Sequence, residues 1–446
     1  MSSNLDYSIP NPKIDPARRP PRAFKPDGSP NDNDRVEIGP TDRAFEEWAA
    51  LGLDVPNLDR MRQARLSRLC AELKKHDYAA ALLFDPLNIR YATDSTNMQL
   101  WVAHNPCRAV FVSAEGHVVL WDFHRCEHLS SHLPLVKEIR YGAGFFYMLV
   151  GDKEEQQAAR FAGEIDDLLR QHGGGNRRLA VDKMEISGVV ALQRAGIDIG
   201  SGQHVMEQAR LIKSPDEINA MRCAIATCEI AMEAMYEAMQ PGVAEVELWS
   251  VLHAENIKRG GEWIETRILS SGPRTNPWMR EAGPRKIEEG DLVAFDTDLI
   301  GPYGMCADLS RTWYVGDRTP VAEQRQLYQI AHEHIMSNME LLKPGVTFCE
   351  LTQRENRLPD KYRPQRYGVL MHGVGLCDEF PAIYYAEDFI EGAVDYVLEP
   401  GMVICVEAYV GESGGRHGVK LEDQVLITEG GYENLTNFRF DDRLLG

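Results

Sequence analysis

Two aspartates follow one short apolar segment of the chain, and a third stands within another. The first segment, DLVAFDTD, ends in Asp296 and Asp298, and Asp308 occurs in the second, GMCADLSRTW. If the first segment is a β-strand, side chains two residues apart project from the same face, so Asp296 and Asp298 lie side by side. Carboxylates this close repel one another unless a cation lies between them. A charged turn between two strands is the alternative interpretation of an isolated Asp-x-Asp pattern.

Further residues of metal-binding type follow nearer the C-terminus. His372 occurs in MHGVG, Glu407 ends the apolar segment MVICVE, and Glu422 occurs in GVKLED. With the three aspartates they provide five carboxylates and one imidazole, a set that suits two divalent ions of the manganese, iron or zinc type. Each residue alone has a simpler explanation, since a single histidine is usually structural and a single glutamate is usually solvated. The prediction of a dinuclear metal site therefore rests on the set.

An internal repeat predicts how these residues meet. The segments QPGV and KPGV each precede a helical pattern, and residues 287–296 (IEEGDLVAFD) match residues 398–407 (LEPGMVICVE). Each copy supplies a turn, an apolar strand and a terminal carboxylate. Two such halves packed around a pseudo-two-fold axis would bring Asp296 and Glu407 face to face. Chance similarity of two short segments is the alternative.

The pattern of residues divides the chain into three parts. Residues 46–207 alternate amphipathic helices with short apolar strands, including a β-hairpin at 110–121, which is typical of an α/β domain. Residues 208–446 contain the repeat, and their first predicted helix, 215–239, follows a serine N-cap with Pro and Glu in its first turn. Residues 1–45 are rich in proline, which opposes regular helix and sheet. This last part is either disordered or an extended arm that wraps a partner subunit.

Composition places the chain among soluble globular proteins. It has 446 residues and a formal charge of -20, which disfavours binding to nucleic acid. We expect a cytoplasmic protein that binds a small molecule rather than a membrane, because there is no N-terminal apolar signal core and no apolar run of membrane-spanning length. The nine cysteines form no Cys-x-x-Cys pair and are expected to be reduced thiols.

The order Asp, Asp, His, Glu, Glu over the repeated halves resembles the pita-bread metallopeptidase superfamily, which includes creatinase, prolidase and aminopeptidase P. The resemblance covers residues 208–446, and the preceding domain looks like the creatinase N-terminal domain. It implies an α/β N-terminal domain followed by an α+β pita-bread domain with a pseudo-two-fold internal repeat. The resemblance also implies the metal ligands, which are Asp296, Asp308, His372, Glu407 and Glu422.

The sequence departs from the peptidases of this superfamily at three places. Asp298 stands two residues after the first ligand, where those peptidases usually have glycine. Residues 271–279 (SGPRTNPWM) contain no histidine, although the peptidases have one in this region. Residues 378–381 read Asp-Glu-Phe-Pro where the peptidases typically have His-Glu-x-Pro. The loss of both histidines argues against peptide hydrolysis, whereas the metal ligands are kept.

With the metal ligands kept and the peptidase histidines lost, the reaction that these residues can support is an elimination. Two metal ions that bind a substrate carboxylate stabilise the enolate formed when a proton leaves the adjacent carbon. An aspartate in place of the peptidase histidine, Asp378, can take that proton, and a sulfonium on the next carbon leaves as a neutral thioether. Aromatic rings bind such a cation by cation–π contacts, about 0.5–2 kcal/mol for each ring. The candidates are Trp278, Tyr367 and Trp101, with packing in the core as the alternative role of each.

The same departures resemble the metal-dependent dimethylsulfoniopropionate lyases of the DddP type, which share the pita-bread fold. The resemblance implies cleavage of dimethylsulfoniopropionate to dimethyl sulfide and acrylate, with Asp298 as an additional metal ligand, Asp378 as the base and Tyr367 in the substrate pocket. It also implies a homodimer with two divalent ions per subunit, iron being the expected metal and manganese or zinc the alternatives. An Xaa-Pro dipeptidase or aminopeptidase-like metallohydrolase is the alternative function, and a non-catalytic binding protein is a third.

Overall fold

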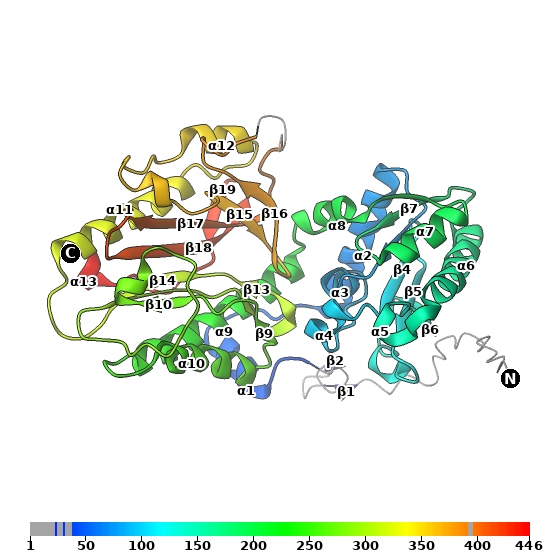
Figure 1. Ribbon diagram of the computed structural model, residues 1–446, viewed down its shortest axis with the longest axis horizontal. Helices are drawn as coiled ribbons and strands as arrows, with labels where there is room; N and C mark the ends of the chain where they lie inside the picture. The colour runs from blue at the N-terminus through cyan, green and yellow to red at the C-terminus, as the bar shows by residue number, and fades with distance from the viewer. Residues whose placement is uncertain (1–22, 25–29, 32–37, 391–395) are drawn as a thin grey trace. The chain divides into compact units, whose positions relative to one another are not determined.

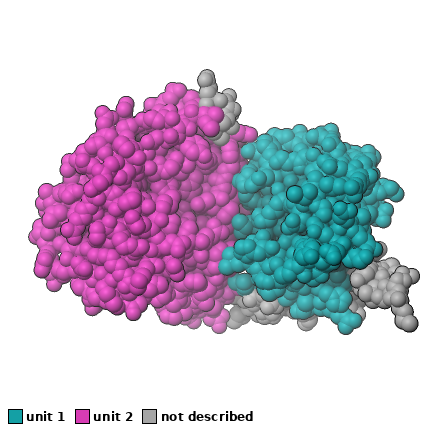
Figure 2. Space-filling model, viewed as in Figure 1, with its two compact units in different colours: residues 1–38, 57–210 teal, residues 39–56, 211–446 magenta. Residues whose placement is uncertain are grey.

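The computed structural model describes most of the chain beyond its first residues. The described residues are 23–24, 30–31, 38–390 and 396–446. Contacts within the chain divide it into two compact units (Figure 2). Unit 1 consists of residues 1–38 and 57–210, and unit 2 consists of residues 39–56 and 211–446. Among the described helices, none combines the length and the hydropathy needed to cross a bilayer.

The predicted arm, residues 1–45, lies largely outside the described residues. Its described part contains a ribbon of two short antiparallel strands, β1 (Ala23–Phe24) and β2 (Pro30–Asn31). It also contains the start of helix α1 (Asp42–Ala50). Whether the remainder wraps a partner subunit stays a prediction.

Unit 1 is an α/β domain around one six-stranded sheet, as the alternating pattern predicted (Figure 1). The strand order is β6-β5-β4-β3-β7-β8. The strands are β3 (Ala80–Leu83), β4 (Ala109–Ser113), β5 (Val118–Asp122), β6 (Val136–Tyr141), β7 (Arg178–Val181) and β8 (Asp198–Ser201). The helices are α2 (Leu58–Lys75), α3 (Pro86–Thr93), α4 (Gln99–His104), α5 (Tyr147–Val150), α6 (Glu154–His172), α7 (Ile186–Arg194) and α8 (Gly202–Leu211), with 3-10 turns at Glu127–Leu129 and Gly151–Lys153.

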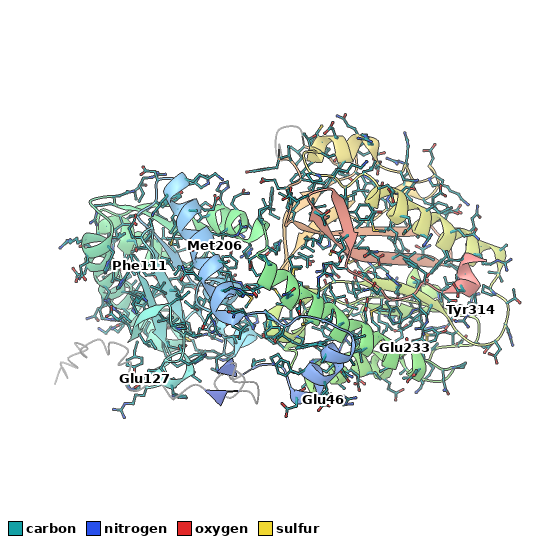
Figure 3. The ribbon with its side chains drawn as sticks, turned by 180° about the vertical axis from the view of Figure 1, so that it is seen from behind. Glu46, Phe111, Glu127, Met206, Glu233 and Tyr314 are labelled. Carbon is teal, nitrogen blue, oxygen red and sulfur yellow. The ribbon has the colours of Figure 1, made fainter. Side chains whose placement is uncertain are left out.

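The centre of this sheet forms the core of unit 1. Strands β4 and β5 pair antiparallel as the predicted hairpin, and β3 pairs in parallel with β7. All residues of β3, β4 and β5 are buried. Phe111 of β4 is one of the apolar side chains of this core (Figure 3). Burial on both faces explains why these strands appear in the sequence as continuous apolar runs.

Unit 2 is built on an eight-stranded sheet of order β10-β11-β14-β18-β17-β15-β16, with β19 paired to β18. Its strands are β10 (Leu269–Ser271), β11 (Leu292–Asp296), β14 (Ser310–Tyr314), β15 (Met371–Val374), β16 (Asp378–Ile383), β17 (Val403–Gly411), β18 (Gly418–Thr428) and β19 (Gly431–Asn434). A small second sheet contains β9 (Trp263–Ile264), β12 (Leu299–Ile300) and β13 (Cys306–Ala307). Besides α1, the helices are α9 (Pro215–Ala238), α10 (Glu245–Lys258), α11 (Ala322–Met339), α12 (Phe348–Arg354) and α13 (Asp442–Leu445), with 3-10 turns at Gly272–Thr275, Pro302–Gly304 and Arg363–Gln365.

The internal repeat is visible as two equivalent sets of backbone hydrogen bonds. In the first half the amide of Gly242 donates to the carbonyl of Ile287, and in the second the amide of Gly345 donates to the carbonyl of Leu398, both at 2.8 Å. Each half then continues into a central strand, β11 or β17. The halves meet where β14 pairs with β18. The pseudo-two-fold repeat predicted from the sequence is therefore confirmed.

Helix α1 differs from the predicted domain organisation. Residues 46–207 were expected to form the first domain, but the segment 39–56 belongs to unit 2. Trp48 of α1 is fully buried in an apolar cluster with residues of α9. Figure 3 shows α1, which carries Glu46, beside α9, which carries Glu233. The packing of Trp48 against α9, and not the sequence pattern of residues 39–56, decides to which unit this segment belongs.

Candidate metal centre and active site

Strands β17 and β18 have one mainly apolar face, and the opposite face carries several ionisable side chains. Val406 of β17 and Leu421 of β18 lie in the apolar cluster that includes α11. The alternate side chains Glu407, Lys420 and Glu422 therefore project from the opposite face. Glu407 and Glu422 are paired across the two strands, and both are fully buried. Carboxylates buried in this way need compensating charge or hydrogen bonds.

The strand register connects the acid of the first half with those of the second. Asp296 is the last residue of β11, and its partner on β14 is Ser310, which is in turn the partner of Glu422 on β18. The Ser310 Oγ atom is 2.5 Å from Oδ1 of Asp296 and 2.9 Å from Oε2 of Glu422. Predicted ligands from both halves of the repeat thus surround one serine.

Asp298 also lies near this cluster, but not through the strand alternation that its spacing predicted. Strand β11 ends at Asp296, and Asp298 has a φ of +35°, in the left-handed region. A turn of the backbone, and not strand alternation, directs its side chain. Carboxylate oxygens of Asp296, Asp298 and Asp308 nevertheless lie within 4.8 Å of one another. Aspartate tolerates the left-handed region better than most residues, which explains why it can replace the glycine of the peptidases here.

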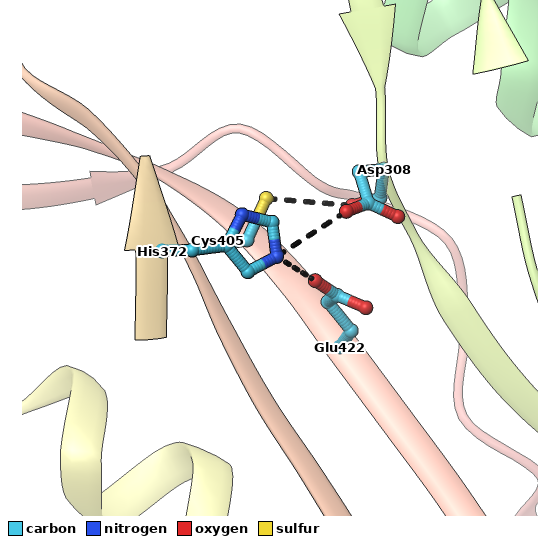
Figure 4. Close-up of side chains that lie close together, drawn as sticks. All are labelled: Asp308, His372, Cys405 and Glu422. Carbon is cyan, nitrogen blue, oxygen red and sulfur yellow. Dashed lines mark hydrogen bonds and ion pairs between the residues drawn. The ribbon is translucent and has the colours of Figure 1, made fainter. Parts of the chain in front are cut away.

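Three carboxylates converge on the Nε2 atom of His372, two of them shown in Figure 4. The distances are 3.2 Å to Oε1 of Glu422, 3.4 Å to Oδ2 of Asp308 and 3.5 Å to Oε1 of Glu407. The Nδ1 atom of the ring is 3.1 Å from the backbone oxygen of Gly373. With its proton on Nδ1, the ring donates to that carbonyl and directs the lone pair of Nε2 toward the carboxylates. This is the arrangement of a histidine that ligates a metal.

Buried carboxylate oxygens in this cluster show that a cation fits here. Oδ1 of Asp308 and both side-chain oxygens of Glu407 are buried and accept no hydrogen bond within the described part of the chain. Burial and the charge of Glu422 raise the pKa of Asp308 and Glu407 well above their usual values, although Lys420 opposes this at Glu407. A divalent cation would supply partners for these oxygens and would favour their ionised form.

The candidate ligands form two groups that share Asp308. One contains Asp308, His372, Cys405 and Glu422, and the other contains Asp296, Asp298 and Asp308. Cys405 was not predicted, although it lies two residues before Glu407 and so projects from the same face of β17. Its thiol is 3.8 Å from the backbone oxygen of Asp308 (Figure 4). All six predicted ligands are therefore in or directly beside the two groups.

Lys420 is the main residue of the site that sequence reasoning missed. It is fully buried, and its Nζ atom lies 2.6 Å from Glu422, 2.9 Å from Asp296 and 3.0 Å from Glu407. Burial lowers the pKa of Lys420, but the attraction of these carboxylates outweighs it and holds the pKa well above its usual value. The signal was present in the sequence, because Lys420 stands two residues before Glu422 and must share its face of the strand.

Asp378, the predicted base, lies at the edge of this cluster. It begins β16, its side chain is 51% exposed, and its Oδ1 atom is 3.9 Å from Nδ1 of His372. Partial loss of hydration beside the cluster and the charge of Glu422 raise the pKa of Asp378, in spite of the attraction of His372. A half-exposed carboxylate with a raised proton affinity is suited to accept a proton from a ligand that enters from solvent.

Two of the three predicted aromatic residues lie beside the cluster. The Nζ atom of Lys420 is 4.6 Å from the ring centre of Tyr367 and 6.0 Å from that of Trp278. Trp278 also stacks on Tyr409, with 5.6 Å between the ring centres. Trp101 belongs to unit 1, where it is 43% exposed and its ring centre lies 6.2 Å from that of Phe123. Its place in a substrate pocket stays a prediction.

Comparison with known proteins agrees with the fold of both units. The profile of Metallopeptidase family M24 matches residues 219–429, and that of the Creatinase/Prolidase N-terminal domain matches residues 65–212. An Xaa-Pro dipeptidase from Bacillus anthracis has a similar structure, with a TM-score of 0.69 over 85% of this chain and 99% of that chain. At 24% sequence identity this likeness supports the fold alone.

Two curated relatives extend over nearly the whole chain. The dimethylsulfoniopropionate lyase DddP of Roseovarius nubinhibens is 56% identical over 439 residues, which is 97% of this chain and 98% of that protein. The protein of the same name from Roseobacter denitrificans is 52% identical over the same share of both chains. The chain, whose residues 219–429 match metallopeptidase family M24, therefore belongs to the DddP family of dimethylsulfoniopropionate lyases.

Proposed function

We propose that this chain cleaves dimethylsulfoniopropionate into dimethyl sulfide and acrylate. One observation carries the proposal: Asp378, which stands where the resemblance implies a peptidase histidine, lies beside side chains that could hold a metal ion. The near-full-length similarity to lyases of that name supports the same substrate.

Six residues are proposed to hold two divalent ions. Iron is the metal that we propose, and manganese and zinc suit the same donors. Asp308, His372, Glu407 and Glu422 would hold one ion, and Asp296, Asp298 and Asp308 would hold the other. When bound, the ions supply Lewis-acid stabilisation of the charge that develops on a substrate carboxylate as its α-carbon loses a proton.

Asp378 is proposed to be the general base. Its carboxylate accepts the α-proton of the substrate, and the electron pair of that C–H bond forms the new C=C bond. The C–S bond breaks at the same time or afterwards, and its electron pair leaves with the sulfur as neutral dimethyl sulfide. Acrylate remains, and the proton stays on Asp378 until it is lost to solvent. The exposure of this carboxyl favours that last transfer.

The substrate cation needs a partner of its own. We propose that Tyr367 and Trp278 contact the sulfonium group, with Trp101 as a further candidate, because aromatic rings attract cations at little desolvation cost. The positions of Tyr367 and Trp278 beside the carboxylate cluster support this role. We also propose that the protein is a cytoplasmic homodimer.

The test is an incubation of the metal-loaded protein with dimethylsulfoniopropionate, followed by measurement of acrylate in solution and of dimethyl sulfide in the gas phase. We expect the two products in equal amounts. An Xaa-Pro dipeptide is given to the same preparation in parallel, because a hydrolase on this fold would cleave it. Release of proline without any acrylate would overturn the proposal in favour of the peptidase.

A further inference from the structure

The buried ammonium group of Lys420 has an acceptor for each of its three protons. Its three protons can be donated to Oε2 of Glu422 at 2.6 Å, to Oγ of Ser310 at 2.8 Å and to Oδ2 of Asp296 at 2.9 Å. Oε2 of Glu407 is also within 3.0 Å of Nζ, but it accepts no hydrogen bond from it. The three donors are already used, which explains why Glu407 is left without one.

Each of the two glutamates of the cluster has one carboxylate oxygen near His372 and the other near Lys420. Oε1 of Glu407 and Oε1 of Glu422 lie 3.5 Å and 3.2 Å from Nε2 of His372. Their Oε2 atoms lie 3.0 Å and 2.6 Å from Nζ of Lys420. A carboxylate that is held through one oxygen keeps a fixed orientation for the other. The geometry therefore presents the Oε1 atoms toward the histidine, where a metal ion would be bound.

The balance of charge in the metal site also indicates a role for Lys420. Five of the six predicted ligands are carboxylates, and all five would have to be ionised to bind metal. Two divalent ions compensate four of these charges, and the ammonium of Lys420 compensates the fifth. Asp378 then remains as the carboxylate whose charge is available to accept a proton. Lys420 is fully buried, so its action passes through the carboxylates and not through direct contact with a substrate.

We propose that Lys420 is a positioning residue of the metal site: it holds the second oxygens of Asp296 and Glu422 by hydrogen bonds and that of Glu407 by an ion pair, and thereby directs the first oxygens of the glutamates to the metal. The inference rests on the metal site of the proposed function, and it does not depend on the identity of the substrate. It predicts that removal of the ammonium changes both the affinity for metal and the geometry of the ligands. Both changes can be measured without an assay of turnover.

The experiment compares three variants of the full chain, each stripped with a chelator and then titrated with cobalt(II). Lys420→Met removes the charge and the donors, and Lys420→Gln keeps a polar side chain in case the methionine variant does not fold. Lys213→Met is the matched control, because Lys213 is also buried and contacts a carboxylate, Glu379, that is not a predicted ligand. The readouts are the cobalt dissociation constant, the number of ions bound and the visible absorption of the bound cobalt.

We expect both Lys420 variants to bind cobalt about 10–100-fold more weakly than wild type, the range observed when partners of metal ligands are removed. The absorption spectrum should also change, because the carboxylates are free to reorient. Lys213→Met should keep the wild-type affinity and spectrum even where its unfolding midpoint falls. Unchanged or tighter cobalt binding by a folded Lys420 variant would overturn the proposal, since the lysine would then be a bystander or a competitor. A wild-type protein that binds cobalt but forms no acrylate would contradict the proposed function and leave this inference intact.

Discussion

Replacement of Asp298 by asparagine should have opposite effects on the metal-free and the metal-loaded protein. Burial, followed by the charges of Asp296 and Asp378, raises the pKa of Asp298 to about 8. The unfolded chain has a value of about 3.9. Because the folded protein binds this proton more tightly, its stability falls as the pH rises between the two values, and the loss is complete above the folded pKa.

The magnitude follows from the width of this pH window. About three pH units of it lie below pH 7, and each unit corresponds to about 1.4 kcal/mol, so ionisation of Asp298 costs at most about 4 kcal/mol at neutral pH. Partial exposure to solvent screens the charge and reduces the cost below this limit. Asparagine cannot ionise and tolerates the same left-handed backbone, so Asp298→Asn removes the electrostatic cost without adding strain.

The assay is urea unfolding of wild type and Asp298→Asn at several pH values from 5 to 8, first with a chelator and then with manganese. In chelator the variant should be the more stable protein, with an advantage that grows by up to about 1.4 kcal/mol per pH unit. With manganese the order should reverse, because the variant has lost a charged ligand. Asp360→Asn serves as the control, since the side chain of Asp360 is 90% exposed. A variant whose advantage in chelator is the same at pH 5 and pH 8 would refute the reasoning.

Three further predictions concern the base, the pocket and a buried histidine. Asp378→Asn should keep both metal ions but lose about 100–10,000-fold in kcat, the usual contribution of a general base; near-wild-type turnover would exclude Asp378 from that role. Trp278→Leu should raise KM by roughly 2–30-fold, from a cation–π contact of about 0.5–2 kcal/mol, and an unchanged KM would assign the ring to packing alone. Burial lowers the pKa of His334 to about 4, so wild type should lose about 2 kcal/mol between pH 7 and pH 5, as the unfolded chain gains a proton that the folded state does not accept. His334→Gln should remove that part of the loss in unfolding experiments, and an identical pH dependence in both proteins would contradict the assignment.

The chemistry of the site was more predictable than its geometry. Glu407 and Glu422 lie within runs in which alternate side chains belong to the apolar core, so their common face follows from strand periodicity. The same rule applies to Lys420, which was overlooked because a lysine is not a metal ligand and its role appears only when three carboxylates surround it. Strand periodicity failed for Asp298, because the strand ends two residues earlier and a left-handed backbone directs the side chain.

Other features depend on contacts that no local pattern contains. The repeat of turn, strand and carboxylate indicated two like halves, and the matching hydrogen bonds of Gly242 and Gly345 bear this out. The helix α1 could not be assigned to unit 2 from sequence, because its position depends on the burial of Trp48 against α9. Aromatic residues both pack in cores and line pockets, so the type of residue alone does not assign a role to Trp278 or Trp101.

Metal-dependent elimination is the central claim, and a titration with two readouts tests it most directly. Chelator-treated protein is given iron(II) or manganese(II) in steps, and bound metal and the rate of acrylate formation from dimethylsulfoniopropionate are measured on the same samples. We predict no acrylate without metal and a rate that rises with loading to a plateau at about two ions per chain. Full activity in the metal-free protein, or no acrylate at complete loading, would contradict the account.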